Sequence, residues 1–187
     1  VNHGISTGAL FLVVGMLYER RHSREITEYG GLARVTPALM AVLLIFALAS
    51  IGLPGTNGFV GEFLILSGTF TSTWEHGKLW GALGGLGVVL GAVYMLYLYQ
   101  RVAFGPVRVA ANRGLPDMSA REWTVMVPMV LAVFLVGVYP GPFLKAMEKG
   151  VDDFVRRAES GRPRAAAAQP ARELPLPPEF KRILRGR

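Results

Sequence analysis

The sequence predicts an all-α integral membrane protein with about four transmembrane helices, the second of them discontinuous, followed by a C-terminal amphipathic helix and a tail. Hydrophobic residues make up 51% of the 187 residues, and charged residues only 18%. The apolar residues gather in blocks without a charge, at residues 4–18, 38–61, 79–100 and 125–144. About 20 apolar residues cross the hydrocarbon layer of a membrane. We therefore assign one span to each block and expect residues 1–144 to be a transmembrane region.

The first block is barely long enough for a span, and the chain begins inside it. A membrane protein seldom starts within a helix. We therefore expect the sequence to be the C-terminal part of a longer polypeptide. At the end of this block, Glu19, Arg20 and Arg21 are interpreted as a solvated charge cluster.

The second block continues to residue 70 and would make a helix of about 50 Å if it were continuous, which is longer than a membrane requires. Pro54 removes a backbone donor, and Gly55 and Gly58 permit non-helical dihedral angles. We expect two half-helices around an unwound centre, the second beginning near residues 57–59. Because unpaired backbone groups cost several kcal/mol in hydrocarbon, this break must face protein or water.

The third block contains five glycines between residues 81 and 91, at spacings that let helices approach closely. The fourth block contains Pro140 and Pro142 near its end, and proline cannot continue a helix. Residues 145–160 are expected to form an amphipathic helix at the membrane surface. The remaining residues, 161–187, are rich in alanine, proline and arginine and are expected to be a disordered tail.

Basic residues are divided unevenly among the connections between the blocks. The first and third connections each carry four arginines, whereas the second carries a single lysine. The positive-inside rule places the first and third connections in the cytoplasm and both termini outside, although the basic tail would favour the inside. The net charge of +7 is therefore attributed to contacts with lipid head groups, and no nucleic acid partner is expected.

Two ionisable residues, His3 and Glu62, lie within the predicted spans, each directly beside a charge-free block. A carboxyl group at membrane depth is costly and most often belongs to a proton or ion path. The positive end of the second half-helix favours the charged form of Glu62 and burial favours the neutral form, so the group can exchange a proton. His3 can accept a proton on one ring nitrogen and donate from the other. The alternatives are a protonated structural acid and a packing histidine.

The chain contains no cysteine, which excludes thiolate metal sites, iron–sulfur ligation and cysteine nucleophiles. Its histidines lie in different parts of the chain, and no metal site is predicted. The glycine-rich stretches of the third block follow no strand, so no cofactor-binding loop is predicted either.

Three motifs in the first 70 residues are long and specific: "NHG", "LYERRHSR" and "LPGTNGFVGEF". With them, the chain from residue 1 to about residue 144 resembles the C-terminal region of the antiporter-like M subunits, chain 4 in mitochondria, of the proton-pumping NADH:quinone oxidoreductase, respiratory complex I. The resemblance implies the last four helices of a subunit built from two inverted repeats, each with a broken helix.

The resemblance also implies a role for the candidate residues in a proton-translocation path coupled to electron transport. His3 would belong to a relay across the subunit, Glu62 would be the terminal group of a proton channel, and Pro54, Gly55 and Gly58 would form the helix break. NADH, FMN, iron–sulfur clusters and quinone would belong to the rest of the complex, and this chain would carry no redox site. Its partners would be other membrane subunits and the lipid bilayer of a bacterial inner membrane.

Two alternatives stay open. Mrp-type cation/proton antiporter subunits share the broken helix, but the antiporter relatives and the related L subunit typically have lysine where this chain has Glu62. A purely structural membrane subunit is the second alternative, and it predicts that Glu62 can be replaced without effect. The first half-channel of the family is not in this sequence, which places independent pumping in doubt.

Overall fold

A computed structural model describes residues 1–168, and every regular element in that range is a helix. The longer helices are α1 (Asn2–Arg21), α2 (Pro37–Ser50), α3 (Asn57–Phe70), α4 (Gly77–Ala103), α5 (Ala120–Val138) and α6 (Gly141–Ala168). Short 3-10 turns are η1 (Ile26–Glu28), η2 (Leu32–Arg34) and η3 (Ala110–Asn112). The predicted all-α class is therefore confirmed for the part of the chain that the structure describes.

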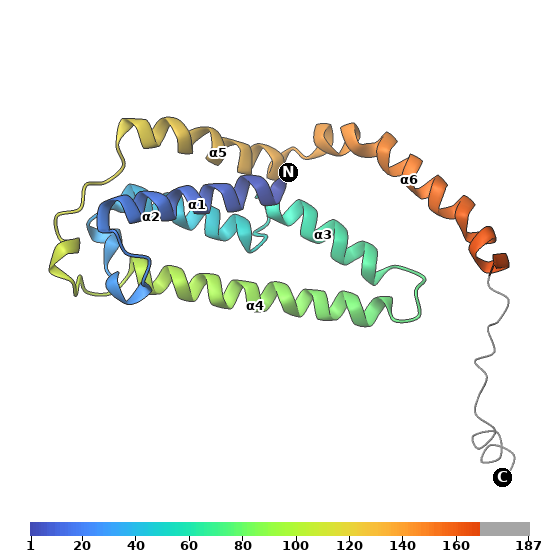
Figure 1. The fold of residues 1–187 in the computed structure, drawn as a ribbon, viewed down its shortest axis with the longest axis horizontal. Coiled ribbons are helices and arrows are strands. Elements are labelled where there is room, and N and C mark those ends of the chain that lie inside the picture. The colour runs from blue at the N-terminus through green and yellow to red at the C-terminus, as the bar shows by residue number, and fades with distance from the viewer. Residues whose placement is uncertain (169–187) are drawn as a thin grey trace, which may run out of the picture. The chain divides into compact units, whose positions relative to one another are not determined.

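The chain divides into two compact units, Val1–Gly141 and a second that begins at Pro142. In the first unit, α1 packs against α2, α3 and α5, and α4 packs against α2 and α3. Figure 1 shows α4 extending along both α2 and α3, with α3 continuing beyond the end of α2. Helices α1 to α5 therefore form one bundle.

The second unit contains α6 almost entirely, and this helix is longer than predicted. It begins four residues before the expected position, in keeping with the tolerance of the first helical turn for a proline such as Pro142. It ends at Ala168 after a run of four alanines, the strongest helix formers. Residues 161–168, expected to belong to a disordered tail, are therefore helical, and residues 169–187 lie outside the described range.

The core of the bundle surrounds α2, whose apolar residues cover its whole circumference. Phe46, Leu39 and Met40 of this helix are almost completely buried, together with Val13 of α1 and Met126 of α5. Helix α4 is also apolar but largely exposed. Helices α4 and α5 are long and apolar enough to cross a membrane, and α2 is a shorter apolar helix.

Helix α2 ends in a Schellman motif. The amide of Leu53 donates to the carbonyl of Leu48 at 3.1 Å, and the amide of Gly52 donates to that of Ala49 at 3.3 Å. Gly52 has a φ of +77°, the left-handed conformation that this motif requires. The last carbonyl groups of α2 are thus satisfied before the chain turns.

A tight turn then connects α2 to α3. The amide of Thr56 donates to the carbonyl of Leu53 at 3.0 Å, which places Pro54 and Gly55 at the two central positions. Gly55 has a φ of +91°. Proline followed by a residue with positive φ is the signature of a type II turn. Helix α3 begins at Asn57, at the start of the predicted range.

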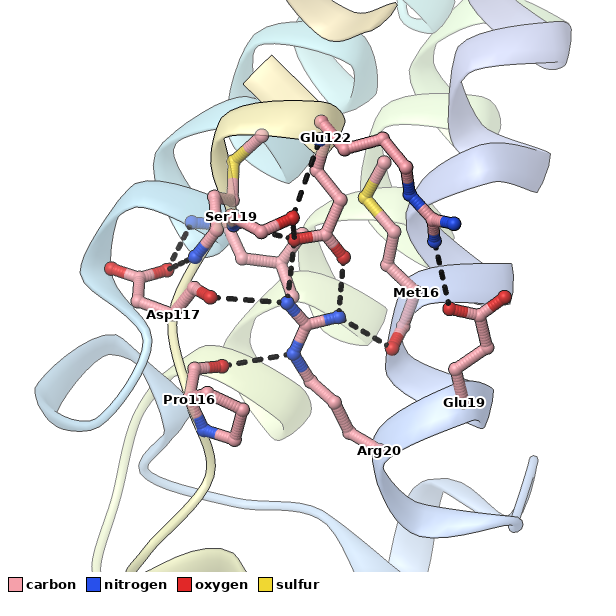
Figure 2. A network of polar contacts seen from close by, with 10 residues as sticks. Met16, Glu19, Arg20, Pro116, Asp117, Ser119 and Glu122 are labelled. Atoms are coloured by element: carbon pink, nitrogen blue, oxygen red, sulfur yellow. Dashed lines mark hydrogen bonds and ion pairs between the residues drawn. The ribbon is translucent and has the colours of Figure 1, made fainter. Parts of the chain in front are cut away.

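Near the C-terminal end of α1, a buried ion pair joins α1 to α5 (Figure 2). Arg20 binds Glu122 through two hydrogen bonds of 2.7 and 2.8 Å, and the two side chains are 9% and 7% exposed. The other donors of Arg20 bind the carbonyl groups of Met16, Pro116 and Asp117 at 2.8 to 3.1 Å. All five guanidinium N–H groups therefore have acceptors, and the interpretation of Arg20 as solvated is wrong.

The same network fixes the beginnings of α2 and α5. Ser119 and Glu122 form a reciprocal capping box at the start of α5. The Asp117 carboxylate accepts from the amides of Ala38 at 2.9 Å and Leu39 at 3.1 Å, and so caps α2 from a distant segment. Three helices are thus held together at this end of the bundle.

Candidate functional site

A cavity of about 500 Å³ lies beside the break between α2 and α3. It contains both ionisable residues predicted from the apolar blocks, His3 from α1 and Glu62 from α3. The remaining lining residues are Asn2, Ser6, Thr7, Leu10, Ala49, Ser50, Gly58, Gly61, Ile65, Tyr94 and Met95. The structure therefore brings His3 and Glu62, which are far apart in the sequence, to one site. A cavity of this volume has room for several water molecules.

The carboxyl group of Glu62 reaches back towards the break, as helical side chains point towards the N-terminus of their helix. It lies so close to the Cα of Gly52 that a Cβ atom there would collide with its Oε2. Among residues 1–160, no group donates a hydrogen bond to this carboxyl group and no cation pairs with it. Glu62 can therefore gain or lose a proton without breaking a contact that holds the fold.

His3 lies in the first turn of α1, at the exposed side of the cavity. Its Nδ1 atom is 3.1 Å from the hydroxyl oxygen of Thr7, one helical turn later. When the Thr7 hydroxyl donates to Nδ1, the neutral ring carries its proton on Nε2. That proton is then free to be passed on, and Nδ1 remains oriented by Thr7.

A buried amide connects the start of α3 to the start of α1. Asn57 is completely buried; its Oδ1 accepts from the hydroxyl of Ser6 at 3.1 Å, and its Nδ2 donates to the carbonyl of Asn2 at 3.0 Å. These bonds hold the helix that carries Glu62 against the turn that carries His3. Sequence reasoning missed them, because the only signal was a polar residue at the first position of α3.

The predicted break residues have different positions relative to the cavity. Gly58 lines it, and a Cβ atom there would collide with the carbonyl oxygen of Ala49, so glycine allows α3 to approach α2. Pro54 and Gly55 form the turn and are not among the lining residues. Gly52, which sequence reasoning did not select as a site residue, contacts Glu62 directly.

Two further polar residues of the cavity were not predicted. The hydroxyl of Ser50 is buried and has no partner among the described residues, and Tyr94 enters the lining from α4. Serine and tyrosine hydroxyls both donate and accept hydrogen bonds. They supply the polar surface that water needs to remain inside an otherwise apolar bundle.

The chain is similar to a known family and to named proteins. Residues 1–91 match the family described as NADH:quinone oxidoreductase/Mrp antiporter, transmembrane. The chain is 41% identical over 170 residues to NADH-quinone oxidoreductase subunit M of Mycobacterium tuberculosis, covering 91% of this chain and 30% of that protein. It is 45% identical over 141 residues to subunit M of Rhodobacter capsulatus, covering 75% of this chain and 27% of that protein.

A similar fold occurs in a solved structure. A chain of respiratory complex I from Thermus thermophilus with bound NADH matches 76% of this chain at 40% identity, with a TM-score of 0.68. The match covers 29% of that chain. The sequence thus spans about 30% of the length of the curated relatives it matches.

Proposed function

We propose that this chain, whose residues 1–91 match the family described as NADH:quinone oxidoreductase/Mrp antiporter, transmembrane, forms part of a proton path in a membrane-arm subunit of a proton-pumping NADH:quinone oxidoreductase. One observation carries the proposal. The unpaired carboxyl group of Glu62 shares a single cavity with His3, directly beside the interruption between α2 and α3.

Each residue has a defined task in this path. Glu62 takes up a proton from the cavity and releases it again, because no structural partner holds it in one charge state. His3 accepts a proton on one ring nitrogen and passes another from the second, while Thr7 orients the ring. Water in the cavity bridges the two groups. Gly52 and Gly58 leave space for the carboxyl group and for the close approach of α3 to α2.

The membrane arrangement follows from the same proposal. The first unit crosses the membrane four times, with α1, α4 and α5 as single spans and α2 with α3 as one discontinuous span. The backbone of the break is satisfied by the Schellman motif and the turn, and the rest of the segment faces the cavity. The first and third connections lie in the cytoplasm of a bacterium, and α6 lies at the membrane surface.

The remaining parts of the reaction are assigned to other subunits. The chain would contact neighbouring membrane subunits and lipid, and NADH, FMN, iron–sulfur clusters and quinone would be bound elsewhere in the complex. Its own residues would move protons only. The identity of 40% or more to named complex I subunits supports this function over that of an Mrp-type antiporter.

The substitution Glu62→Gln in the intact complex tests the proposal, because the amide preserves the shape but cannot cycle a proton. We expect NADH-driven proton uptake into proteoliposomes to fall by at least about tenfold while the complex still assembles. Glu62→Asp should retain part of the flux. Glu75→Gln, the same change in an exposed connection, serves as the matched control and should pump normally.

Normal pumping by assembled Glu62→Gln would contradict the proposal and favour a purely structural membrane subunit. Transport that depended on Na⁺ and not on NADH oxidation would favour an Mrp-type function instead. Measuring quinone reduction and proton uptake on the same preparation separates these results.

A further inference from the structure

A second cavity, of about 420 Å³, lies where the C-terminal end of α4 meets the connection after α1. Its lining includes Tyr29, Tyr97, Arg101, Phe104 and Arg108. Two hydrogen bonds hold its walls together: the amide of Gly31 donates to the carbonyl of Phe104, and the side chain of Asn112 donates to the carbonyl of Glu28, both at 2.9 Å. The cavity is thus built from the first and third connections, which the charge pattern assigns to the same side of the membrane.

The charge of this cavity is positive and unbalanced. Arg101 and Arg108 are the charged residues of its lining, and neither takes part in an ion pair within the described chain. Tyr29 donates its hydroxyl to the carbonyl of Ser23 at 2.7 Å, and burial raises the pKa of this phenol, so it stays neutral. Glu28 is bound to Arg21 at 3.1 Å. Both lining arginines are exposed and are therefore available to bind an anion that enters the cavity.

An exposed apolar stripe on α4 leads directly to this cavity. Leu86, Leu90, Val93 and Tyr97 follow one another at helical spacing on one face and are each more than half exposed. Arg101 is the next residue on that face, and its guanidinium carbon is 5.7 Å from the centre of the Tyr97 ring. The distance along the helix from Leu86 to Tyr97 is about 16 Å, or half of the roughly 30 Å of membrane hydrocarbon.

We propose that this cavity binds the phosphate group of an anionic phospholipid, with an acyl chain of the same molecule lying along the stripe formed by Leu86, Leu90, Val93 and Tyr97. The two guanidinium groups match the geometry and the charge of a phosphodiester. Tyr97 lies at the level of the head groups, where interfacial aromatic residues are found. Basic cavities on the cytoplasmic side of a membrane protein suit such lipids.

A free phosphate shares the head-group chemistry, but it would leave the apolar stripe uncovered. The continuity of the stripe with the two arginines therefore favours the lipid. The inference rests on the membrane location given under the proposed function, but it does not depend on proton transfer by Glu62.

The experiment uses the assembled complex in liposomes that contain a trace of phosphatidylglycerol with a photoreactive group in its acyl chain. Labelling of the α4 peptide is measured by mass spectrometry, with photoreactive phosphatidylcholine as the neutral comparison. We expect phosphatidylglycerol to label α4 more strongly. The double variant Arg101→Gln/Arg108→Gln should reduce this labelling by about fivefold for each arginine removed, or about twenty-five-fold in total.

Two further variants serve as controls. Arg113→Gln/Arg121→Gln removes two arginines that follow the cavity in the sequence but do not line it. Labelling should change by less than about twofold, because salt screens exposed charges that do not contact the phosphate. Arg101→Lys/Arg108→Lys keeps both charges and should retain most of the labelling. If the lysine variant retains its labelling, the loss of labelling in the glutamine variant is due to the missing charge and not to misfolding.

Equal labelling of the wild type by the two lipids would overturn the inference, and so would unchanged labelling in Arg101→Gln/Arg108→Gln. Complete displacement of phosphatidylglycerol by inorganic phosphate at about 10 mM would overturn it as well, because the site would then bind phosphate without needing the acyl chain. Photolabelling of a neighbouring subunit in place of α4 would also overturn it, because the stripe would then be covered by protein. Glu62→Gln should label like the wild type, which separates this result from failure of the proton path.

Discussion

Glu122 and Glu62 are two carboxyl groups of one helical bundle in opposite situations. Glu122 is bound by Arg20 and by the amide and hydroxyl of Ser119 (Figure 2). Glu62 has no hydrogen bond or ion pair within the described residues and faces a cavity. The two regions lie near opposite ends of α1, where Arg20 and His3 are about 25 Å apart along the helix axis.

Glu122 is a structural acid held by its partners, whereas the contacts of Glu62 leave it able to exchange a proton, as the proposed function requires. Protonation of Glu122 would remove the charge that Arg20 needs and leave a buried cation without a counterion. Protonation of Glu62 changes no contact that holds helices together. The number of partners around a carboxyl group, more than its depth in the bundle, therefore indicates which of the two roles it serves.

The largest expected effect comes from breaking the structural end of the bundle with Arg20→Ala. This change leaves Glu122 buried without its cation and removes the bonds to Met16, Pro116 and Asp117. Removing one partner of a buried ion pair typically costs about 3–5 kcal/mol. We expect a lower midpoint of thermal unfolding and reduced assembly of the complex.

The neighbouring residue provides the control for this prediction. Arg21 is 13% exposed but pairs with Glu28, whose side chain is 48% exposed, and a pair with one partner this open to solvent contributes less than a fully buried one. Arg21→Ala should therefore assemble nearly normally. If Arg20→Ala and Arg21→Ala lowered the unfolding midpoint and the assembly equally, burial of the Arg20 network would not determine the stability of this end of the bundle.

An intermediate effect is expected for Gly52→Ala, which links the fold of the break to the chemistry of Glu62. Alanine at a φ of +77° is strained by about 1–3 kcal/mol, and its methyl group would displace the Glu62 carboxyl group. We expect both a lower unfolding midpoint and a lower NADH-driven proton flux in assembled complex.

Gly55→Ala separates strain from displacement. Gly55 also has a positive φ, of +91°, but a Cβ atom added there would have no neighbour within 4 Å. This variant should lose similar stability and keep most of its flux. If its flux fell as far as that of Gly52→Ala, the contact between Gly52 and Glu62 would have no functional importance.

The smallest expected effect is that of His3→Ala at the exposed side of the cavity. A water molecule can occupy the space of the imidazole and bridge the path at a cost of up to about 2 kcal/mol, or about thirtyfold in rate. We expect a reduced flux with normal assembly, measured as a function of pH. His76→Ala, in an exposed connection, is the control, and flux identical to wild type across the pH range would assign His3 to packing alone.

Several features of the site followed from local sequence. The apolar blocks indicated long helices, and Pro54 with Gly55 and Gly58 indicated an interruption where the structure has the turn between α2 and α3. His3 and Glu62 were recognisable as candidates because ionisable residues are rare within apolar blocks. These features depend on residue type and short-range geometry, which a sequence contains directly.

Other features could not be recognised in the same way. Arg20 stands among charged residues at a helix end, where a solvated side chain is the ordinary expectation, yet it is buried because Glu122 and the carbonyl groups of the α5 entry segment meet it there. Ser6 and Asn57 gave no signal of the bonds between them. Such pairs depend on how distant helices pack.

The helices, their interruption and the two candidate proton carriers are thus properties of the chain itself, because dihedral preferences and hydrophobic blocks act over a few residues. The shared cavity of His3 and Glu62, the contact of Gly52 with the carboxyl group, and the burial of Arg20 arise only when α1, α2, α3 and α5 pack together. Packing brings together residues 51 and 102 positions apart, in the pairs Ser6–Asn57 and Arg20–Glu122. It thereby decides which carboxyl group is satisfied and which remains free to exchange a proton.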